Sequence, residues 1–253
     1  HIQFHSYGGG SEEETSLCSK ARVLAEYVNA HPELTVDVGQ VLFGETTSMT
    51  GDGPLGYYLQ KVSGKKWYSA DTELESGCGV SPIEYKNKNF IHALQWAIGL
   101  EWYLLVADPW QVVMSTDHPN GGSFLAYPQI IRLLMDREFR REMVAQLNPA
   151  VLKHSCLADL DREYTLSEIA VITRAGPARI LGLKRKGHLG VDADADICVY
   201  EPNSNYQRMF ELPHMVIKGG RVLVEDTEIR QTVEGKTLMA NPSYDRHRNE
   251  SIE

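Results

Sequence analysis

The sequence predicts an α/β protein built on a parallel sheet, because strand-like and helix-like segments alternate along its first 180 residues. Three strands can be recognised: one that ends near the N-terminus in residues 1–4, one over residues 34–43 and one over residues 112–116. Eight strands would be needed to close a (β/α)8 barrel. The pattern therefore predicts either a small open sheet or a piece of a larger protein.

Apolar spacing defines the elements of this alternating region. The first helix is expected over residues 12–29 and the second over residues 90–106, because apolar residues recur there every three or four positions. Valines at alternate positions predict the strand over residues 34–43. Residues 112–116 form a continuous apolar run, which is typical of a strand that is buried on both faces. These segments supply two strand–helix–strand connections.

The remaining segments contain clear turn and helix signals. Residues 44–89 are rich in glycine and lack periodicity, and long loops of this kind usually form lids or binding loops. One helix is expected from Pro128, with helical spacing as far as Met143. The sequence TLSE at residues 165–168 matches a capping box and predicts another helix start. Short β segments follow residue 182, and two of them are joined by a predicted hairpin turn, KGGR.

Composition excludes several classes of protein. The chain has 25 Lys+Arg against 34 Asp+Glu, a formal charge of −9, which argues against nucleic-acid binding and against attraction to an anionic membrane. Its most apolar stretch, residues 90–106, contains His, Gln and Glu and is too short for a membrane span. The four cysteines lie far apart without a CxxC pair, which favours a reducing compartment, the cytoplasm, over a disulfide scaffold.

The strongest signal for chemistry is the polar segment that directly follows the apolar strand at residues 112–116. Asp117 would lie at the carboxyl edge of the sheet, where α/β active sites collect. A carboxylate there can bind a metal ion and carry a proton, and His118 and Asn120 are candidate substrate contacts. The alternative is that Asp117 only caps the following turn. The pattern alone leaves both interpretations open.

Three other groups of polar residues receive structural interpretations. His1 and His5 could bind zinc, but an HxxxH pair predicts a metal site only on a helix with a partner Glu. Residues 184–186 are interpreted as a solvated run of charge. Alternating aspartates at residues 192–196 resemble a calcium loop but lack its central Gly and closing Glu.

Several longer motifs resemble the amidohydrolase superfamily. Residues 187–200, GHLGVDADADICVY, are similar to the signature that marks the return of the chain from the barrel to a small β-sandwich. Residues 173–183, TRAGPARILGL, resemble the helix that precedes it. The sequence TDHPN at residues 116–120 is similar to the motif of the eighth-strand aspartate.

Within that superfamily, the chain resembles the A subunits of formylmethanofuran dehydrogenase from residue 1 to about residue 241. The more specific motifs are DVGQVLFG, ALQWAIGLE and TDHPNGG. The resemblance implies an α/β fold that is the C-terminal portion of a (β/α)8 barrel plus part of a small β-sandwich. Residues 1–182 would hold barrel strands six to eight with an insertion at 44–89, residues 183–240 the β-sandwich segment, and residues 241–253 a polar tail.

The resemblance also implies a binuclear zinc amidohydrolase, working in a multi-subunit complex of one-carbon metabolism. The family's metal site uses an HxH pair, a carboxylated lysine, two further histidines and the eighth-strand aspartate. Only His1, as the sixth-strand ligand, and Asp117 have counterparts in this chain, with His5 an alternative to His1. Because one catalytic zinc normally takes three protein ligands, this stretch alone is expected to bind no metal pair and to be inactive.

The implied reaction interconverts formate plus methanofuran and N-formylmethanofuran. Asp117 would pass a proton from water to the leaving amine, and His118, Asn120 and Gln40 would contact the substrate. The insertion at residues 44–89 would form a wall around the long arm of methanofuran. Two alternatives stay open: the hydrolytic subunit of a formyltransferase/hydrolase complex, which releases formate in methylotrophic bacteria, and a non-catalytic scaffold subunit.

Overall fold

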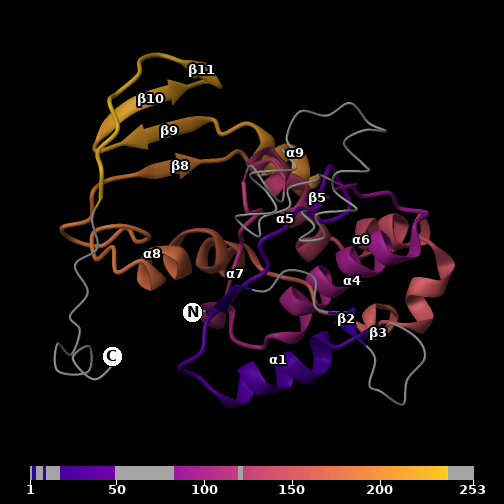
Figure 1. Cartoon of the computed structure of the whole chain (residues 1–253). Helices are drawn as coiled ribbons and strands as arrows, with labels where there is room; N and C mark the ends of the chain where they lie inside the picture. Colours follow the sequence, from indigo (N-terminus) through magenta and orange to yellow (C-terminus); the bar gives the residue numbers. More distant parts are fainter. Residues whose placement is uncertain (1, 4–7, 10–17, 49–82, 119–121, 239–253) are drawn as a thin grey trace, which may run out of the picture.

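A three-stranded parallel sheet lies at the centre of the computed structural model, which describes residues 2–3, 8–9, 18–48, 83–118 and 122–238 (Figure 1). Its strands are β1 (Ile2–Gln3), β4 (Val36–Asp37) and β7 (Val112–Val113), in the order β1-β4-β7. All three run in the same direction, as the alternation of strands and helices predicts. The α/β class is therefore confirmed.

Strand β4 is shorter than the sequence predicts. A strand was expected over residues 34–43, but regular pairing ends at Asp37. Gly39 has a φ of +62° and Phe43 a φ of +55°, so the backbone turns twice within the predicted strand. Val38 and Leu42 stay buried in these turns. The alternating valines indicated burial correctly, but not an extended backbone.

Helix α4 (Phe90–Leu105) shares one core with the valines of the parallel sheet, and most of its side chains are buried. It begins at Asn89, whose side chain accepts a hydrogen bond from the His92 backbone N–H at 3.2 Å. Gly99 allows it to approach the segment that follows β4, because a Cβ at this position would lie 2.7 Å from Leu42 Cδ2. The buried Glu101 of α4 accepts hydrogen bonds from Ser19 and from the Cys156 backbone N–H.

Helix α1 (Ala21–Ala30) packs against α4. The predicted helix over residues 12–29 is wrong at Cys18–Ser19, which form strand β3 and pair with β2 (Gly8–Gly9), while residues 12–17 lie outside the described residues. The single helix predicted from Pro128 to Met143 is also wrong, since it is two helices, α5 (Tyr127–Met135) and α6 (Arg137–Ala145). Asp136 separates them and caps α6 by accepting from Phe139 N.

The helix predicted from the capping box is confirmed. The Thr165 hydroxyl accepts from Glu168 N, and the Glu168 carboxylate accepts from Thr165 N. The chain then runs without interruption through three helical pieces: α7 (Leu166–Ala170), the π-helical turn η5 (Val171–Ala175) and α8 (Gly176–Ile180).

A second sheet, antiparallel and four-stranded, lies at the end of the molecule away from α1 (Figure 1). Its order is β11-β10-β9-β8, from β8 (Ile197–Val199), β9 (Met215–Lys218), β10 (Arg221–Glu225) and β11 (Glu228–Ile229). The predicted hairpin turn is confirmed, since Gly219 and Gly220, with φ values of +56° and +76°, connect β9 to β10. Helix α9 (Tyr206–Glu211) packs on α5. The boundary at residue 182 and the completion of a β-sandwich stay predictions.

Short elements complete the described part of the chain: β5 (Thr47–Ser48), β6 (Ile83–Glu84), η1 (Pro109–Gln111), η2 (Phe124–Ala126), η3 (Pro149–Lys153) and η4 (Leu157–Asp159). Strands β5 and β6 pair with each other at the two ends of the predicted 44–89 insertion. Among the described helices, none is both long and apolar enough to span a bilayer.

Candidate active site at the exit of strand β7

The chain leaves strand β7 through a backbone that is held by helices. The Met114 N–H donates to the carbonyl of Ile172 in η5 at 2.9 Å. The Met114 carbonyl in turn accepts from the Tyr127 hydroxyl of α5 at 3.4 Å. Because the backbone N–H and carbonyl of Met114 both bond to helices, the backbone pairing of β7 with the sheet ends before Met114. The next residues are then free to turn.

The Ile172 carbonyl is available because of a proline. In the π-helical turn, Gly176 N–H donates to Val171 O, five residues back. The next residue in that pattern, Pro177, has no N–H to donate to Ile172. Gly176 also allows close packing, since a Cβ there would lie 3.1 Å from Val113 Cγ1. Gly176 and Pro177 thus determine the backbone contacts at the exit of β7, although they lie far from β7 in the sequence.

Asp117 lies three residues after Met114 and adopts a left-handed conformation with a φ of +49°. Its backbone N–H donates to the Ser115 hydroxyl at 3.3 Å, and the residue is half-buried. Non-glycine residues with positive φ carry backbone strain and are concentrated at functional sites. The structure therefore places Asp117 where the sequence predicts it, after the last parallel strand and at the carboxyl edge of the sheet.

Two tyrosines lie behind this turn, Tyr103 from α4 and Tyr127 from α5. Burial raises the pKa of Tyr103 well above its usual value, and the charges of Tyr127, Tyr164 and Asp37 add to the effect. Burial likewise raises the pKa of Tyr127, although the nearby Arg174 opposes the shift. Both phenols therefore stay protonated near neutral pH. They can donate hydrogen bonds to the turn, but they cannot act as its general base.

His118 is exposed and has a defined orientation. Its Nδ1 lies 3.3 Å from the Gly122 carbonyl, and its ring meets the Phe124 ring edge-on at 4.8 Å. Because a carbonyl oxygen only accepts, we assign the proton of this hydrogen bond to Nδ1. Nε2 then lies on the other side of the ring, where it can contact a ligand.

The other predicted substrate and metal residues are less informative. Gln40 is only 2% exposed, and its Nε2 donates to the Gln95 carbonyl of α4 at 2.9 Å. This bond gives its amide a structural role, and its contact with substrate stays a prediction. His1, His5 and Asn120 lie outside the described residues.

A metal site needs several ligating side chains close together. Within the described ranges, no three His, Cys, Asp or Glu side chains are grouped in a way that could hold an ion. A catalytic zinc normally takes three protein ligands, so Asp117 by itself does not form a zinc site. The described residues alone do not fit zinc, and the predicted zinc pair, with His1 and Asp117 as ligands, stays a prediction.

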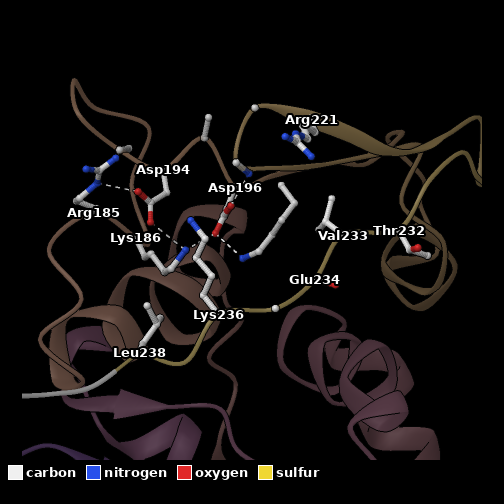
Figure 2. A pocket seen from close by; sticks show the side chains of 16 residues that line it. Arg185, Lys186, Asp194, Asp196, Arg221, Thr232, Val233, Glu234, Lys236 and Leu238 are labelled. Atoms are coloured by element: carbon white, nitrogen blue, oxygen red, sulfur yellow. Dashed lines mark hydrogen bonds and ion pairs between the residues drawn. The ribbon is translucent and has the colours of Figure 1, made fainter.

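A cavity of about 800 Å³ lies elsewhere, beside the antiparallel sheet (Figure 2). Two aspartates of its wall are bound by cations: Asp194 by Arg185 at 2.7 Å, and Asp196 by Lys186 at 2.5 Å and Lys218 at 2.8 Å. The interpretation of residues 184–186 as a solvated run is therefore wrong for Lys186, which contacts both aspartates. These ion pairs give both carboxylates a structural role, and the β7 exit stays the candidate active site.

The pKa values of this cluster agree with its ion pairs. Burial alone would raise the pKa of Asp196, but hydrogen bonds from Lys186, Lys218 and the Gly219 N–H outweigh it and lower the pKa. The hydrogen bonds that Lys186 makes to Asp196 and Asp194 raise the pKa of Lys186. Asp196 and Lys186 are therefore both charged near neutral pH.

Sequence reasoning missed the residues that support the β7 exit, namely Tyr103, Tyr127 and the Gly176-Pro177 pair. One signal was present, because a proline inside a helical pattern removes a backbone donor and frees a carbonyl. The partner of that carbonyl, Met114, could not be read from local spacing. The tyrosines carried no signal other than helical periodicity.

Comparison with known proteins gives the chain a family. The amidohydrolase family model matches residues 3–224. Protein FwdA of Methanocaldococcus jannaschii is 44% identical over 246 residues, which are 94% of this chain and 43% of that protein. The A subunit of the formyltransferase/hydrolase complex Fhc of Methylorubrum extorquens is 41% identical over 255 residues, 97% of this chain and 45% of that protein.

A solved structure shows the same fold. It is the crystal structure of the formyltransferase/hydrolase complex (FhcABCD) from Methylorubrum extorquens with methylofuran. One of its chains matches with a TM-score of 0.80 and 38% identity, over 96% of this chain and 45% of that one. The chain thus spans about half the length of the curated relatives it matches. Since the family model covers most of its residues, the chain belongs to the amidohydrolase family.

Proposed function

We propose that this chain carries the catalytic aspartate of an amidohydrolase that interconverts an N-formyl amine with formate and the free amine. The observation that carries the proposal is the position of Asp117: a half-buried carboxylate in a left-handed turn, directly after β7 at the carboxyl edge of the parallel sheet. Active sites of α/β proteins collect at this edge. Membership of the amidohydrolase family supports amide chemistry there.

Asp117 would move the proton that hydrolysis requires. Water adds to the formyl carbon, the carbon–nitrogen bond breaks, and the leaving amine must gain a proton that water loses. A carboxylate within reach of both atoms can accept that proton and then deliver it. Condensation is the same path in reverse. His118 would offer Nε2 to the formyl or formate oxygens, and Asn120 and Gln40 are further predicted contacts.

The substrate is proposed to be a furan-type one-carbon carrier, methanofuran or methylofuran. FwdA, the A subunit of Fhc and the complex crystallised with methylofuran support this choice, because all three match nearly the whole chain. Other subunits of a formylmethanofuran dehydrogenase or formyltransferase/hydrolase complex would be its partners. The relatives from the two kinds of complex have similar sequence identities to this chain, so sequence identity does not decide between the complexes. We keep the dehydrogenase as the first proposal. The insertion at residues 44–89 as a wall for the carrier, the zinc pair and a cytoplasmic location belong to the same proposal.

The decisive experiment replaces Asp117 by Asn in the natural protein with its partner subunits. Asn caps turns about as well as Asp, so a residue that only capped the turn would tolerate the change. We expect hydrolysis of the N-formyl carrier to fall by about 10²- to 10⁴-fold, the range for loss of a general acid–base group. Zinc content measured on the same samples tests the predicted metal pair.

Asp108→Asn is a matched control. Asp108 caps η1 by accepting from Trp110 N at 2.9 Å, and an Asn there preserves the cap. Its activity should stay within about twofold of the wild type. If Asp117→Asn and the control Asp108→Asn both retained full activity, Asp117 would be a turn cap and the chain a scaffold subunit.

A further inference from the structure

Thr46 occupies a junction between three segments that lie far apart in the sequence. Its side chain is 1% exposed, and its hydroxyl donates to the Val41 carbonyl at 3.0 Å, with the Gly44 carbonyl at 3.2 Å. The same oxygen accepts a hydrogen bond from Trp96 Nε1 of α4 at 2.8 Å. The hydroxyl thus both donates and accepts in a buried place, where such bonds are costly to lose.

The backbone of Thr46 makes two further connections. Its carbonyl accepts from Tyr85 N at 2.9 Å, which joins the two ends of the 44–89 segment. It also pairs with Gly122 in an isolated antiparallel bridge. Gly122 belongs to the polar segment that begins with Asp117. One residue therefore connects the turn after β4, helix α4 and the segment after β7.

Gly122 fits this junction only because it lacks a side chain. A Cβ there would lie 2.4 Å from Val41 Cγ2 and 2.8 Å from the Glu45 carbonyl, and its φ is +143°. The Gly122 carbonyl is also the partner of His118 Nδ1 at 3.3 Å. The orientation of the His118 ring therefore depends on the place of Gly122, and Gly122 is held against the segment 41–46.

We propose that Thr46 is a positioning residue: by holding Gly122 in place, it orients the His118 imidazole beside Asp117. It acts through Gly122 and touches neither the substrate nor the reacting atoms. This inference rests on the proposed function of the Asp117 segment. Its structural part, the holding of Gly122 and His118, can be tested without activity.

Two substitutions at Thr46 separate the hydroxyl from the shape of the side chain. Thr46→Val keeps the β-branched volume but leaves Trp96 Nε1 and the Val41 carbonyl without this partner. Thr46→Ser keeps the hydroxyl and removes only a methyl group. A positioning role predicts rescue by Ser, because the hydroxyl makes the hydrogen bonds.

The test uses the natural protein with its partner subunits. We expect Thr46→Val to lower kcat by about tenfold or more, because small displacements of catalytic groups carry costs of this size, while KM changes less. Amide hydrogen exchange of residues 115–118 and 122–125 should become faster. Thr46→Ser should stay within about twofold of the wild type in both measurements.

Thr173→Val is the control for loss of a half-buried threonine hydroxyl. The Thr173 hydroxyl donates to the Ile169 carbonyl within its own helix at 2.6 Å, and we expect normal kcat and normal exchange of residues 115–118 and 122–125. Gly122→Ala is a second route to the same effect, because its Cβ would displace Gly122 from Val41 without disturbing Trp96. This variant covers the case in which Thr46→Val does not fold.

The outcomes separate the inference from the proposed function. Unchanged kcat and exchange in Thr46→Val, or in Gly122→Ala if the former does not fold, would overturn the positioning role. Equal losses in Thr46→Val, Thr46→Ser and Thr173→Val would also overturn it, since they would indicate general destabilisation. If Asp117→Asn is inactive while Thr46→Val is normal, only the further inference fails. If Asp117→Asn is active, the proposed function fails.

Discussion

The two sheets of the protein are held together in different ways. In the parallel sheet and its extension, Val36, Val38 and Val112 are no more than 1% exposed and lie in the same core as the buried side chains of α4. In the antiparallel sheet, every residue of β8 to β11 is half-buried or exposed. Burial of apolar surface is the main stabilising term in folding. The parallel sheet therefore relies on its core, and the antiparallel sheet has to rely more on polar contacts.

The two aspartates near these sheets, Asp196 and Asp117, have correspondingly different surroundings. Asp196 precedes β8 and is bound by Lys186, Lys218 and the Gly219 N–H, so its charge helps to connect the sheet to the preceding loop. Asp117 follows β7, whose position is already fixed by burial and by the helix contacts of Met114. The proposed role of Asp117 is therefore chemical, in contrast to the structural role of Asp196.

The largest contrast is expected from removal of apolar side chains. Leu100 of α4 is fully buried, so Leu100→Ala should lower the free energy of unfolding by about 2–5 kcal/mol. Val222→Ala in the half-buried β10 should lower it by only about 1 kcal/mol, the typical value for a point substitution. Urea unfolding of the natural protein measures both. Equal losses would show that the antiparallel sheet has a core of similar quality.

A smaller effect is expected at Asp196. Asp196→Asn keeps the size of the side chain but removes the charge that Lys186 and Lys218 bind, and the cost should be about 1 kcal/mol because these groups are partly exposed. Activity should be unchanged, in contrast to Asp117→Asn. Thermal unfolding measures the stability of Asp196→Asn, and the formyl hydrolysis assay compares the activities of Asp196→Asn and Asp117→Asn. Loss of activity in Asp196→Asn, with the complex intact, would contradict the division of roles between the two aspartates.

Much of the fold was predictable because its signals are local. The capping box at Thr165, the Gly-Gly hairpin after β9 and the apolar spacing of α4 each lie within a few residues, and the structure contains all three. The failures came from competing contacts. Residues 18–19 pair as a strand instead of extending α1, and Asp136 caps α6 and so ends α5.

The candidate site was predictable only in part, for the same reason. Asp117 could be found because a carboxylate after an apolar strand is a local pattern. Its supports could not, since Ile172 reaches Met114, and Thr46 reaches Gly122, only after folding. Threonine, tyrosine and glycine are also common residues with many uses. Their roles depend on contacts between distant segments, which periodicity does not report.

The smallest expected effect is a difference in how the two regions respond to acid. The pKa of Asp196 is lowered in the folded protein, so its contribution to stability is fully present above about pH 4, the unfolded pKa of Asp, and is lost as the pH falls through the folded pKa. Burial raises the pKa of Glu101 in α4, although hydrogen bonds from Ser19 and Cys156 oppose the shift. Its contribution has the opposite sign: it is present at low pH and is lost as the pH rises through the folded pKa.

Hydrogen exchange between pH 6 and pH 2, corrected for intrinsic rates, can separate the two regions. We expect protection of β8, β9 and β10 to decrease on acidification by an amount that Asp196→Asn removes, because the neutral side chain cannot titrate. Protection of α4 should lack this Asp196-dependent decrease, since α4 depends on burial and Glu101 is more easily accommodated when protonated. If both sheets lost protection together in the wild type and in Asp196→Asn, acid would act on the whole molecule, and the ion pairs of Asp196 would have no separate role.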